Sequence, residues 1–192
     1  MMGRFLNFES SDYSFNDGLK AGFMVLDEFI WTHATSPGFI YIADATGLSF
    51  GHLTCINLMS VKKLLDYVQN ALPVHLKAIH IINMSPIAEI IFNMFKPFIK
   101  TEMMDLIYFH SSMESANEHF SIQVLPNELG GKAGPIQELV NAQIKKIANF
   151  GEWFLEDERI NRVDESLRIN KISKAPNNLF GADGSFKKLE ID

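Results

Sequence analysis

Apolar residues near the start of the chain recur at the spacing of a helix. Within residues 18–31 they are separated mostly by three or four positions, which places them on one face: Leu19, Phe23, Leu26, Phe29 and Ile30. We therefore expect a helix over this range, capped at its start by Asn16 or Asp17. Residues 61–71 repeat the pattern, and this second helix is expected to close before Pro73.

Two short apolar runs, residues 39–43 and 79–82, predict strands that are buried on both faces. The first is bounded by Pro37 and Gly38 before it and Gly47 after it, which favours a strand over a helical segment. A helix between two such strands is a β-α-β crossover. We therefore predict an α/β fold, a mostly parallel sheet with helices packed around it.

Residues 107–109 and 122–125 are further candidate strands in the second half of the chain. A helical stretch follows over residues 136–154, interrupted by Gly151. From about Asp164 onward the sequence is polar with scattered apolar residues, which is typical of a tail that wraps the surface or is partly mobile.

The segment from Pro86 to Lys100 is apolar around most of a helix. Its polar residues fall four, three and four positions apart, so they form one narrow stripe: Glu89, Asn93, Lys96 and Lys100. The segment is shorter than the roughly 20 residues that span a bilayer, and Pro97 is expected to kink or end it. Two interpretations stay open. One is a core helix packed on nearly all sides, and the other is a lid that closes an apolar cavity and touches lipid with its outer face.

Composition and charge narrow the functional class. At 192 residues, 47% hydrophobic and 21% charged, the chain is typical of one globular domain with a substantial core. Its formal net charge of -6 argues against a nucleic-acid binder, because phosphate contacts need a basic surface. The single cysteine, Cys55, cannot form an internal disulfide, and the first residues lack the apolar region of a signal peptide. We expect a monomeric cytoplasmic protein that is peripheral to membranes.

Established catalytic and metal-binding motifs do not occur in the sequence. The six histidines show neither H-E-x-x-H nor Cys/His ligand spacing. The Gly130-Gly131-Lys132-Ala133 run lacks the earlier glycine and the hydroxyl residue of a phosphate loop. There is no G-x-S-x-G elbow, and nothing marks Cys55 as a nucleophile, so a buried thiol is expected. We therefore expect no enzymatic activity, no cofactor and no metal site.

Three polar residues at the ends of the predicted strands have structural explanations. Asp44 stands where ligands gather in open α/β sheets, but without a partner acid we expect it to bond the turn from Thr46 to Gly47. His80 and Asn83 are expected to be satisfied polar groups, with Asn83 capping the helix that follows.

Four motifs, in a fixed order and spacing, carry a resemblance to a known family. They are G-F-I-Y-I-A-D-A-T-G-L-S-F-G-H at 38–52, L-P-V-H-L-K-A-I-H-I-I-N at 72–83, K-P-F-I-K at 96–100 and L-P-N-E-L-G-G at 125–131. With them, the stretch from about Arg4 to Phe154 resembles the CRAL-TRIO lipid-binding domain of retinaldehyde-binding, α-tocopherol-transfer and phosphatidylinositol-transfer proteins. The C-terminal tail resembles the insect branch of the tocopherol-transfer-like proteins.

The resemblance implies a hydrophobic lipid-binding cage closed by a gate helix after Asn83. It implies a lipid-binding domain over residues 1–155, without the family's usual N-terminal helical subdomain, and a polar tail over residues 156–192. The implied function is intracellular binding of a hydrophobic small molecule, of the tocopherol, retinoid, carotenoid or phospholipid class, and its transfer between membranes. The alternative is a module that senses lipid without transferring it, or that docks on membranes through phosphoinositides.

The family's cavity positions, carried onto this sequence, give a set of expected ligand contacts. They lie on the first predicted strand and its turn, the next helix and strand, and the gate: Tyr41, Ala43, Leu48, Phe50, Leu64, Tyr67, Val68, Leu72, Val74, Leu76, Ile79, Ile87, Ile90, Ile91, Met94 and Phe95. Tyr41 and Tyr67 are expected to supply a polar handle for a ligand hydroxyl or aldehyde.

The resemblance also implies a phosphoinositide headgroup site, of which this sequence retains only some of the basic residues. Some animal relatives bind such headgroups through four basic positions, which here are His75, Lys77, Glu102 and Leu106. The candidate headgroup residues are thus His75 and Lys77. A carboxylate at position 102 would repel a phosphate, so the site is expected to be depleted or to have moved.

Overall fold

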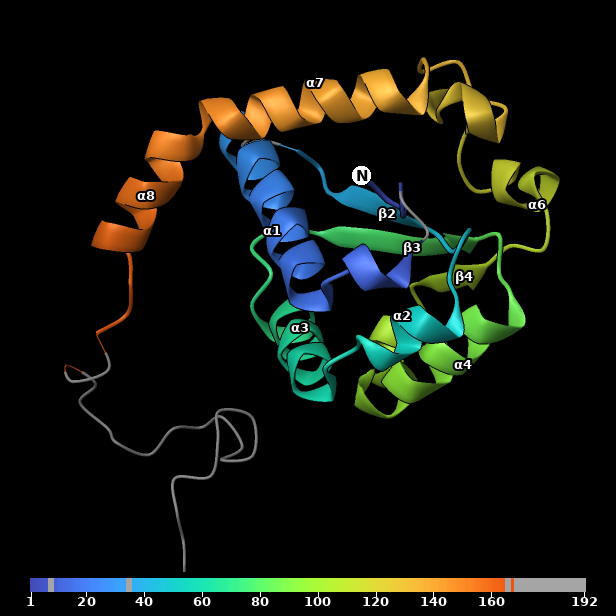
Figure 1. Ribbon diagram of the computed structural model, residues 1–192, viewed down its shortest axis with the longest axis horizontal. Coiled ribbons are helices and arrows are strands. Elements are labelled where there is room, and N and C mark those ends of the chain that lie inside the picture. The colour runs from blue at the N-terminus through green and yellow to red at the C-terminus, as the bar shows by residue number, and fades with distance from the viewer. Residues whose placement is uncertain (7–8, 34–35, 165–166, 168–192) are drawn as a thin grey trace, which may run out of the picture.

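A parallel sheet of four strands forms the centre of the protein (Figure 1). The computed structural model describes residues 1–6, 9–33, 36–164 and 167. The strands lie side by side in chain order: β1 (Met2–Gly3), β2 (Phe39–Asp44), β3 (Leu76–Ile82) and β4 (Ile107–Phe109). Each neighbouring pair in this sheet is parallel. The predicted α/β class with a mostly parallel sheet is confirmed.

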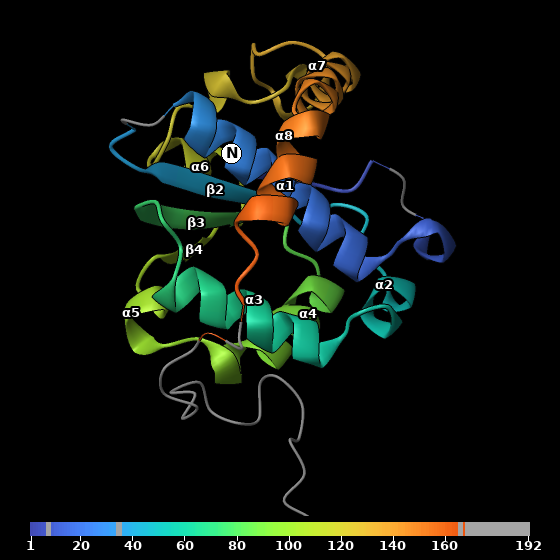
Figure 2. The ribbon, with the colours of Figure 1, turned by 90° about the vertical axis from the view of Figure 1, so that its left-hand side faces the viewer.

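Helices cover both faces of the sheet. They are α1 (Phe15–Thr32), α2 (Phe50–Thr54), α3 (Leu58–Asn70), α4 (Pro86–Phe95), α5 (Thr101–Met104), α6 (Met113–Asn117), α7 (Ile136–Asn149) and α8 (Gly151–Ile160). Short 3-10 turns are η1 (Ser10–Asp12), η2 (Lys96–Phe98), η3 (Ile122–Val124) and η4 (Asn127–Leu129). Figures 1 and 2 show α3 and α4 on one side of the sheet and α7 across the other. Helix α1 packs against α7, and α6 packs against β3.

The first predicted helix is present, but a different residue caps it. The Ser14 hydroxyl, not Asn16 or Asp17, accepts a hydrogen bond from Asp17 N at 3.3 Å. Asn16 and Asp17 already lie within the helix, whereas Ser14 keeps the extended backbone of an N-cap residue. The second predicted helix also starts earlier than expected, at Leu58.

The helix predicted from residue 86 ends at Phe95, directly before the Lys96-Pro97 turn, as the proline predicted. Its cap is Ser85, whose hydroxyl accepts a hydrogen bond from Ala88 N at 3.2 Å. The prediction that Asn83 caps this helix is therefore wrong. Asn83 has a φ of 55°, and its amide donates instead to Asp44 Oδ1 at 2.9 Å.

The strand predicted over residues 122–125 is wrong, because this segment forms the turn η3. Ile122 N donates to Asn117 Oδ1 at 3.1 Å, so the segment is bonded to a nearby side chain and not to a neighbouring strand. Leu125 is buried in the core. The apolar run therefore anchors a loop instead of extending the sheet.

The long helical stretch in the last third is divided, as predicted. Helix α7 ends at Asn149 and α8 begins at Gly151. The tail that resembles the insect branch begins at Arg162 and lies outside the described residues, apart from residues 162–164 and 167. The division between domain and tail after residue 155 stays a prediction.

One face of the sheet is sealed. Side chains alternate between the faces along a strand, and register places Ile42 beside His80 on this face. Helix α6 and the loop after it cover the face and complete its core cluster, which contains Ile42, Ile82, Ala116 and Leu125. Ile42 and Ile82 are only 6% and 1% exposed. We call this the sealed face.

Candidate ligand-binding site

The opposite face of the sheet is mostly apolar but incompletely covered. Tyr41 lies beside Ile79 on this face, and Ala43 lies beside Ile81. All four side chains are half-buried, although their neighbours on the other side of the same strands are sealed. We call this the open face. It carries the predicted contacts Tyr41, Ala43 and Ile79 together.

Helix α4 covers the open face with one side only. Ile87 and Ile91, one turn apart, are buried, and Phe92 packs edge-to-face against Phe109 of β4 with ring centroids 4.8 Å apart. The predicted polar stripe, which includes Glu89, is exposed. Helix α4 is therefore a surface helix with one buried side, and its interpretation as a core helix packed on nearly all sides is wrong.

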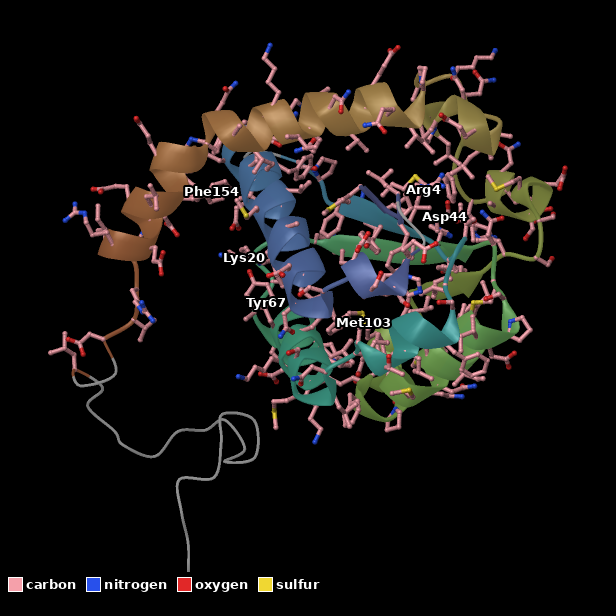
Figure 3. The ribbon with its side chains drawn as sticks, viewed as in Figure 1. Arg4, Lys20, Asp44, Tyr67, Met103 and Phe154 are labelled. Carbon is pink, nitrogen blue, oxygen red and sulfur yellow. The ribbon has the colours of Figure 1, made fainter. Side chains whose placement is uncertain are left out.

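A concavity of about 320 Å³ lies between α1 and α3. Its lining comes from both helices: Asn16, Leu19, Phe23, Ser60, Lys63, Leu64 and Tyr67. The Phe23 and Tyr67 rings meet edge-to-face with centroids 5.2 Å apart, and Figure 3 marks Tyr67 where the two helices approach. Burial, and then the nearby Asp27 carboxylate, raise the pKa of Tyr67, so its hydroxyl keeps the proton that it needs to donate.

Only Leu64 and Tyr67 of this lining were predicted contacts, and the apolar lining residues Leu19 and Phe23 were not among them. Both belong to the apolar spacing that predicted helix α1. The sequence pattern therefore marked them as buried but gave no sign that they meet Leu64 and Tyr67 on α3.

A second concavity, of about 480 Å³, lies at the C-terminal end of α3. The predicted contacts Val68, Leu72, Val74 and Leu76 line it together. The remaining lining residues are Gln69, Asn70, Ala71, His75, Lys100, Glu102, Met103 and Leu106. This concavity thus has an apolar part and a polar part with charges of both signs.

The predicted headgroup positions meet only in part. His75, Glu102 and Leu106 line the second concavity, whereas Lys77 is not part of that lining. Instead, the Lys77 side chain approaches Gly38, where its Cε lies 3.1 Å from the position that a Cβ would take. A headgroup role for His75 and Lys77 stays a prediction.

Gln69 joins the end of α3 to the segment after α4. Its Nε2 donates to Phe98 O at 3.1 Å and to Leu65 O at 2.9 Å, and its Oε1 accepts from Lys100 N at 2.6 Å. One side chain therefore fixes the segment directly after α4 to the end of α3.

Asp44 closes the turn after β2, as predicted. Its Oδ1 accepts hydrogen bonds from Thr46 N at 3.0 Å and Thr46 Oγ1 at 2.7 Å. Its Oδ2 lies 3.5 Å from an Arg4 guanidinium nitrogen, and Figure 3 shows the two residues near each other. The buried carboxylate is thus engaged in structural contacts on both oxygens.

The remaining predicted contacts differ in their surroundings. Phe50, at the start of α2, is 69% exposed, and Ile90, on α4, is 44% exposed, so neither lies with the others in the interior. Leu48, Met94 and Phe95 are half-buried. The assignment of the whole set to a ligand stays a prediction.

Other functional signals are sparse. Cys55 is half-buried, and its thiol donates to Gly51 O at 3.4 Å. No group of three or more potential ligand side chains in the described ranges is arranged to hold a metal ion. The described helices are also too short or too polar to cross a membrane.

Comparison with known sequences gives the family. A family model described as "CRAL/TRIO domain" matches residues 1–131, and so includes all four sequence motifs. The chain belongs to the CRAL/TRIO domain family. The resemblance carried by the motifs is thereby confirmed, and at the level of the family it supports lipid binding or transfer.

Three curated relatives of this CRAL/TRIO protein share the name alpha-tocopherol transfer protein-like. The Mus musculus protein is 29% identical over 128 residues, which cover 66% of this chain and 37% of that protein. The Homo sapiens and Pongo abelii proteins are 28% identical over a segment of the same length. The matched segment thus spans well under half the length of these relatives.

Proposed function

We propose that this CRAL/TRIO protein encloses a hydrophobic small molecule against the open face of the sheet and carries it between membranes. The contrast between the two faces supports the proposal most directly. Along β2, Ile42 is sealed, whereas its neighbours Tyr41 and Ala43 are half-buried. The same chain segment is therefore covered by protein on one side and only partly covered on the other.

A bound apolar molecule would complete this cover. Each square ångström of apolar surface removed from water contributes about 25 cal/mol, so a long isoprenoid or acyl chain gains affinity without charged contacts. The concavities between α1 and α3 and at the C-terminal end of α3, about 320 and 480 Å³, fall within the usual range of small-molecule sites, roughly 300–1,000 Å³. Tocopherols, retinoids, carotenoids and phospholipids fit this chemistry.

Helix α4 is suited to act as the gate. Its inner side buries Ile87 and Ile91 toward the sheet, while Ile90 is exposed on its outer side among polar residues. An amphipathic surface helix of this kind can rest on a bilayer surface without spanning it. A cytoplasmic carrier that touches membranes transiently would need such an element.

Native mass spectrometry of the protein from its source tissue, with organic extraction, tests the binding step. We expect a stoichiometric hydrophobic adduct, and extraction identifies it. Transfer is tested by mixing donor vesicles that carry the identified lipid with acceptor vesicles that lack it. Protein that is folded but consistently empty would contradict the proposal.

The alternative is a module that senses lipid or docks on membranes without transferring its ligand. The second concavity favours it, because His75 and Lys100 line a polar region beside the apolar residues there. Binding without vesicle-to-vesicle transfer, together with tighter binding to vesicles that contain phosphoinositides, would favour this alternative over the carrier.

A further inference from the structure

His52, on the short helix α2, has one ring nitrogen without a partner. The residue is 1% exposed. Its Nδ1 lies 3.2 Å from Ser49 N and 2.8 Å from Ser49 Oγ, at the start of α2. Its Nε2 is buried, and no hydrogen-bonding group of the described residues reaches it. Buried polar atoms without a partner are rare in folded proteins, so this one calls for an explanation.

The bond from Ser49 fixes the tautomer of the His52 ring. A backbone N–H only donates, so Nδ1 of His52 is the acceptor and carries no proton. The single proton of the neutral ring is then on Nε2. The unpartnered atom is therefore a hydrogen-bond donor, and what it lacks is an acceptor.

Aromatic side chains from the N-terminal segment surround this donor. The His52 ring centroid lies 4.7 Å from that of Phe5 and 5.4 Å from that of Tyr13, and these two rings contact each other. The segment fits closely over α2, because a Cβ at Gly51 would overlap the Ser10 side chain. The donor thus lies beside a cluster of aromatic side chains.

Tyr41 carries a second hydrogen-bond donor, on the open face of the sheet. Its hydroxyl reaches over β1, where a Cβ at Gly3 would overlap it. Burial raises the pKa of Tyr41, so the hydroxyl keeps its proton. The Tyr13 ring contacts the His52 ring, and burial, then Cys55 and then Tyr41 raise the pKa of Tyr13.

We propose that the enclosed ligand presents an oxygen acceptor to the Nε2–H of His52, with the Tyr41 hydroxyl as a second donor. The inference rests on the proposed function, because it names the polar end of the molecule that the open face encloses. A buried N–H donor without an acceptor among the described residues is what such an oxygen would satisfy.

The chemistry favours a neutral oxygen, as in an alcohol, aldehyde, ketone or quinone, over a carboxylate. Arg4, next to Phe5 in the same segment, already pairs with Asp44 at 3.5 Å. A carboxylate placed among Phe5, Tyr13 and the neutral His52 ring would lose its hydration without gaining a counter-ion. A neutral oxygen loses less hydration and gains the same hydrogen bonds.

Probes with one carbon skeleton and different polar ends test the inference. Phytane, phytol and phytanic acid share a branched hydrocarbon chain and end in a hydrocarbon, an alcohol and a carboxylate. Their affinities are measured by displacement of diphenylhexatriene, a fluorescent hydrocarbon that needs no hydrogen bond. We expect phytol to bind about tenfold more tightly than phytane, and phytanic acid to bind no more tightly than phytane.

Two substitutions remove the donors while keeping the fold. His52→Gln keeps a side-chain acceptor at the third position of α2, where glutamine forms the same cap, but removes the ring N–H. Tyr41→Phe removes only a hydroxyl. Each is expected to weaken phytol binding about three- to tenfold and to leave phytane binding unchanged. The matched controls are His33→Gln, exposed at the end of α1, and Tyr108→Phe, on the sealed face.

The Nε2–H proton resonance of His52, in protein labelled with 15N-histidine, gives a readout that does not depend on affinity. Phytol is expected to move it downfield as an N–H···O bond replaces contact with aromatic rings. Equal loss of phytol and phytane affinity in the variants, or an unmoved resonance with phytol bound, would overturn this inference and leave the hydrophobic site intact. Failure of diphenylhexatriene and phytane to bind at all would overturn the proposed function as well.

Discussion

His80 Nδ1 lies 2.8 Å from His110 Nε2 in the interior of the protein. The two residues are 2% and 4% exposed, and the rings of Tyr108, His119 and Phe120 pack around His80. One of the two facing nitrogens donates and the other accepts, so both rings fit as neutral imidazoles. The prediction that His80 is a satisfied polar group is confirmed, but its partner was not foreseen.

This histidine pair predicts that stability falls with decreasing pH. Burial, then His110 and then His119, lower the pKa of His80 from 6.5 to about 4, and burial and then His119 lower the pKa of His110. The unfolded chain therefore binds these protons more readily, so the stabilisation is complete above pH 6.5 and is lost as the pH falls toward 4. We expect a loss of about 1–2 kcal/mol, measured by urea unfolding across this range.

A variant without the buried imidazole of His80 checks this assignment. His80→Phe keeps an aromatic ring beside Tyr108 and Phe120 but removes the titrating group, so its stability should change less between about pH 6.5 and 4. His33→Gln, which changes an exposed histidine, should keep the slope of the parent protein. An equally steep profile for His80→Phe would contradict the role of this pair.

Ala43→Phe fills the space that we assign to the ligand. Because Ala43 is half-buried on the open face, the added ring extends toward α3 and α4 and not into the core. We expect diphenylhexatriene to bind at least about tenfold more weakly, with a loss of stability below about 1.5 kcal/mol. Ala78→Phe, on the sealed face, should destabilise the protein more strongly. Similar destabilisation by both substitutions would show that the open face is as tightly packed as the sealed face.

Ile90→Ser separates uptake from transfer. Ile90 is exposed on the outer side of α4, so enclosed binding should be unchanged, while transfer between vesicles should slow severalfold as apolar contact with the bilayer is lost. Ile144→Ser, a change of a similarly exposed residue on α7, serves as the control. Vesicle transfer and diphenylhexatriene binding are measured on the same samples. A loss of binding with Ile90→Ser would instead place this side chain at the ligand.

Gly131→Ala is expected to cost about 2 kcal/mol of stability. A Cβ at Gly131 would overlap the carbonyl oxygen of Leu125, so the loop that anchors Leu125 in the core must shift. Gly151→Ala, at the start of α8, meets no atom within 4 Å and should be neutral or slightly stabilising. Denaturant unfolding compares the two, and equal stabilities would contradict the close approach at Gly131.

Glu102→Lys tests the polar part of the second concavity. Replacing the carboxylate beside His75 and Lys100 by a cation removes a repulsion and adds an attraction for phosphate. Binding to vesicles that contain phosphatidylinositol bisphosphate should increase about three- to tenfold, and binding to neutral vesicles should not change. Glu89→Lys, on the exposed stripe of α4, controls for net charge. Equal gains in both variants would mean that no headgroup site exists there.

Much of the fold could be predicted from the sequence, because the helices and strands follow from the local spacing of apolar residues and from the positions of glycine and proline. The strand β2 and its turn through Asp44 followed from an apolar run bounded by glycine, and the end of α4 followed from Pro97. The segment from Ile122 to Leu125 could not be predicted in this way. Its apolar residues anchor a loop in the core. A short apolar sequence of this length cannot be distinguished from that of a buried strand by its pattern alone.

The candidate site was less predictable than the fold. The alternation of side chains along a strand predicts that Tyr41 and Ile42 point to opposite faces of the sheet. Which of the two faces is sealed depends on how helices distant in the sequence pack against it. His52 illustrates the same limit, since it gave no metal or catalytic motif. Its unpartnered nitrogen depends on Ser49 and on the fit of the N-terminal segment over α2.

The Gln69 side chain bonds both Phe98 O and Lys100 N, so it holds the segment after α4 in place. This tether limits how α4 could move. If α4 opens as the proposed gate, we expect it to pivot about this tethered end, because its other end is held by the Ser85 cap and by the packing of Ile87. The widest displacement then falls at Ile87, near the start of the helix, and the smallest near Phe95. Molecules would then pass at the Ser85 end of α4, beside the turn that the hydrogen bond from Asn83 to Asp44 holds, and this turn would form one edge of the opening.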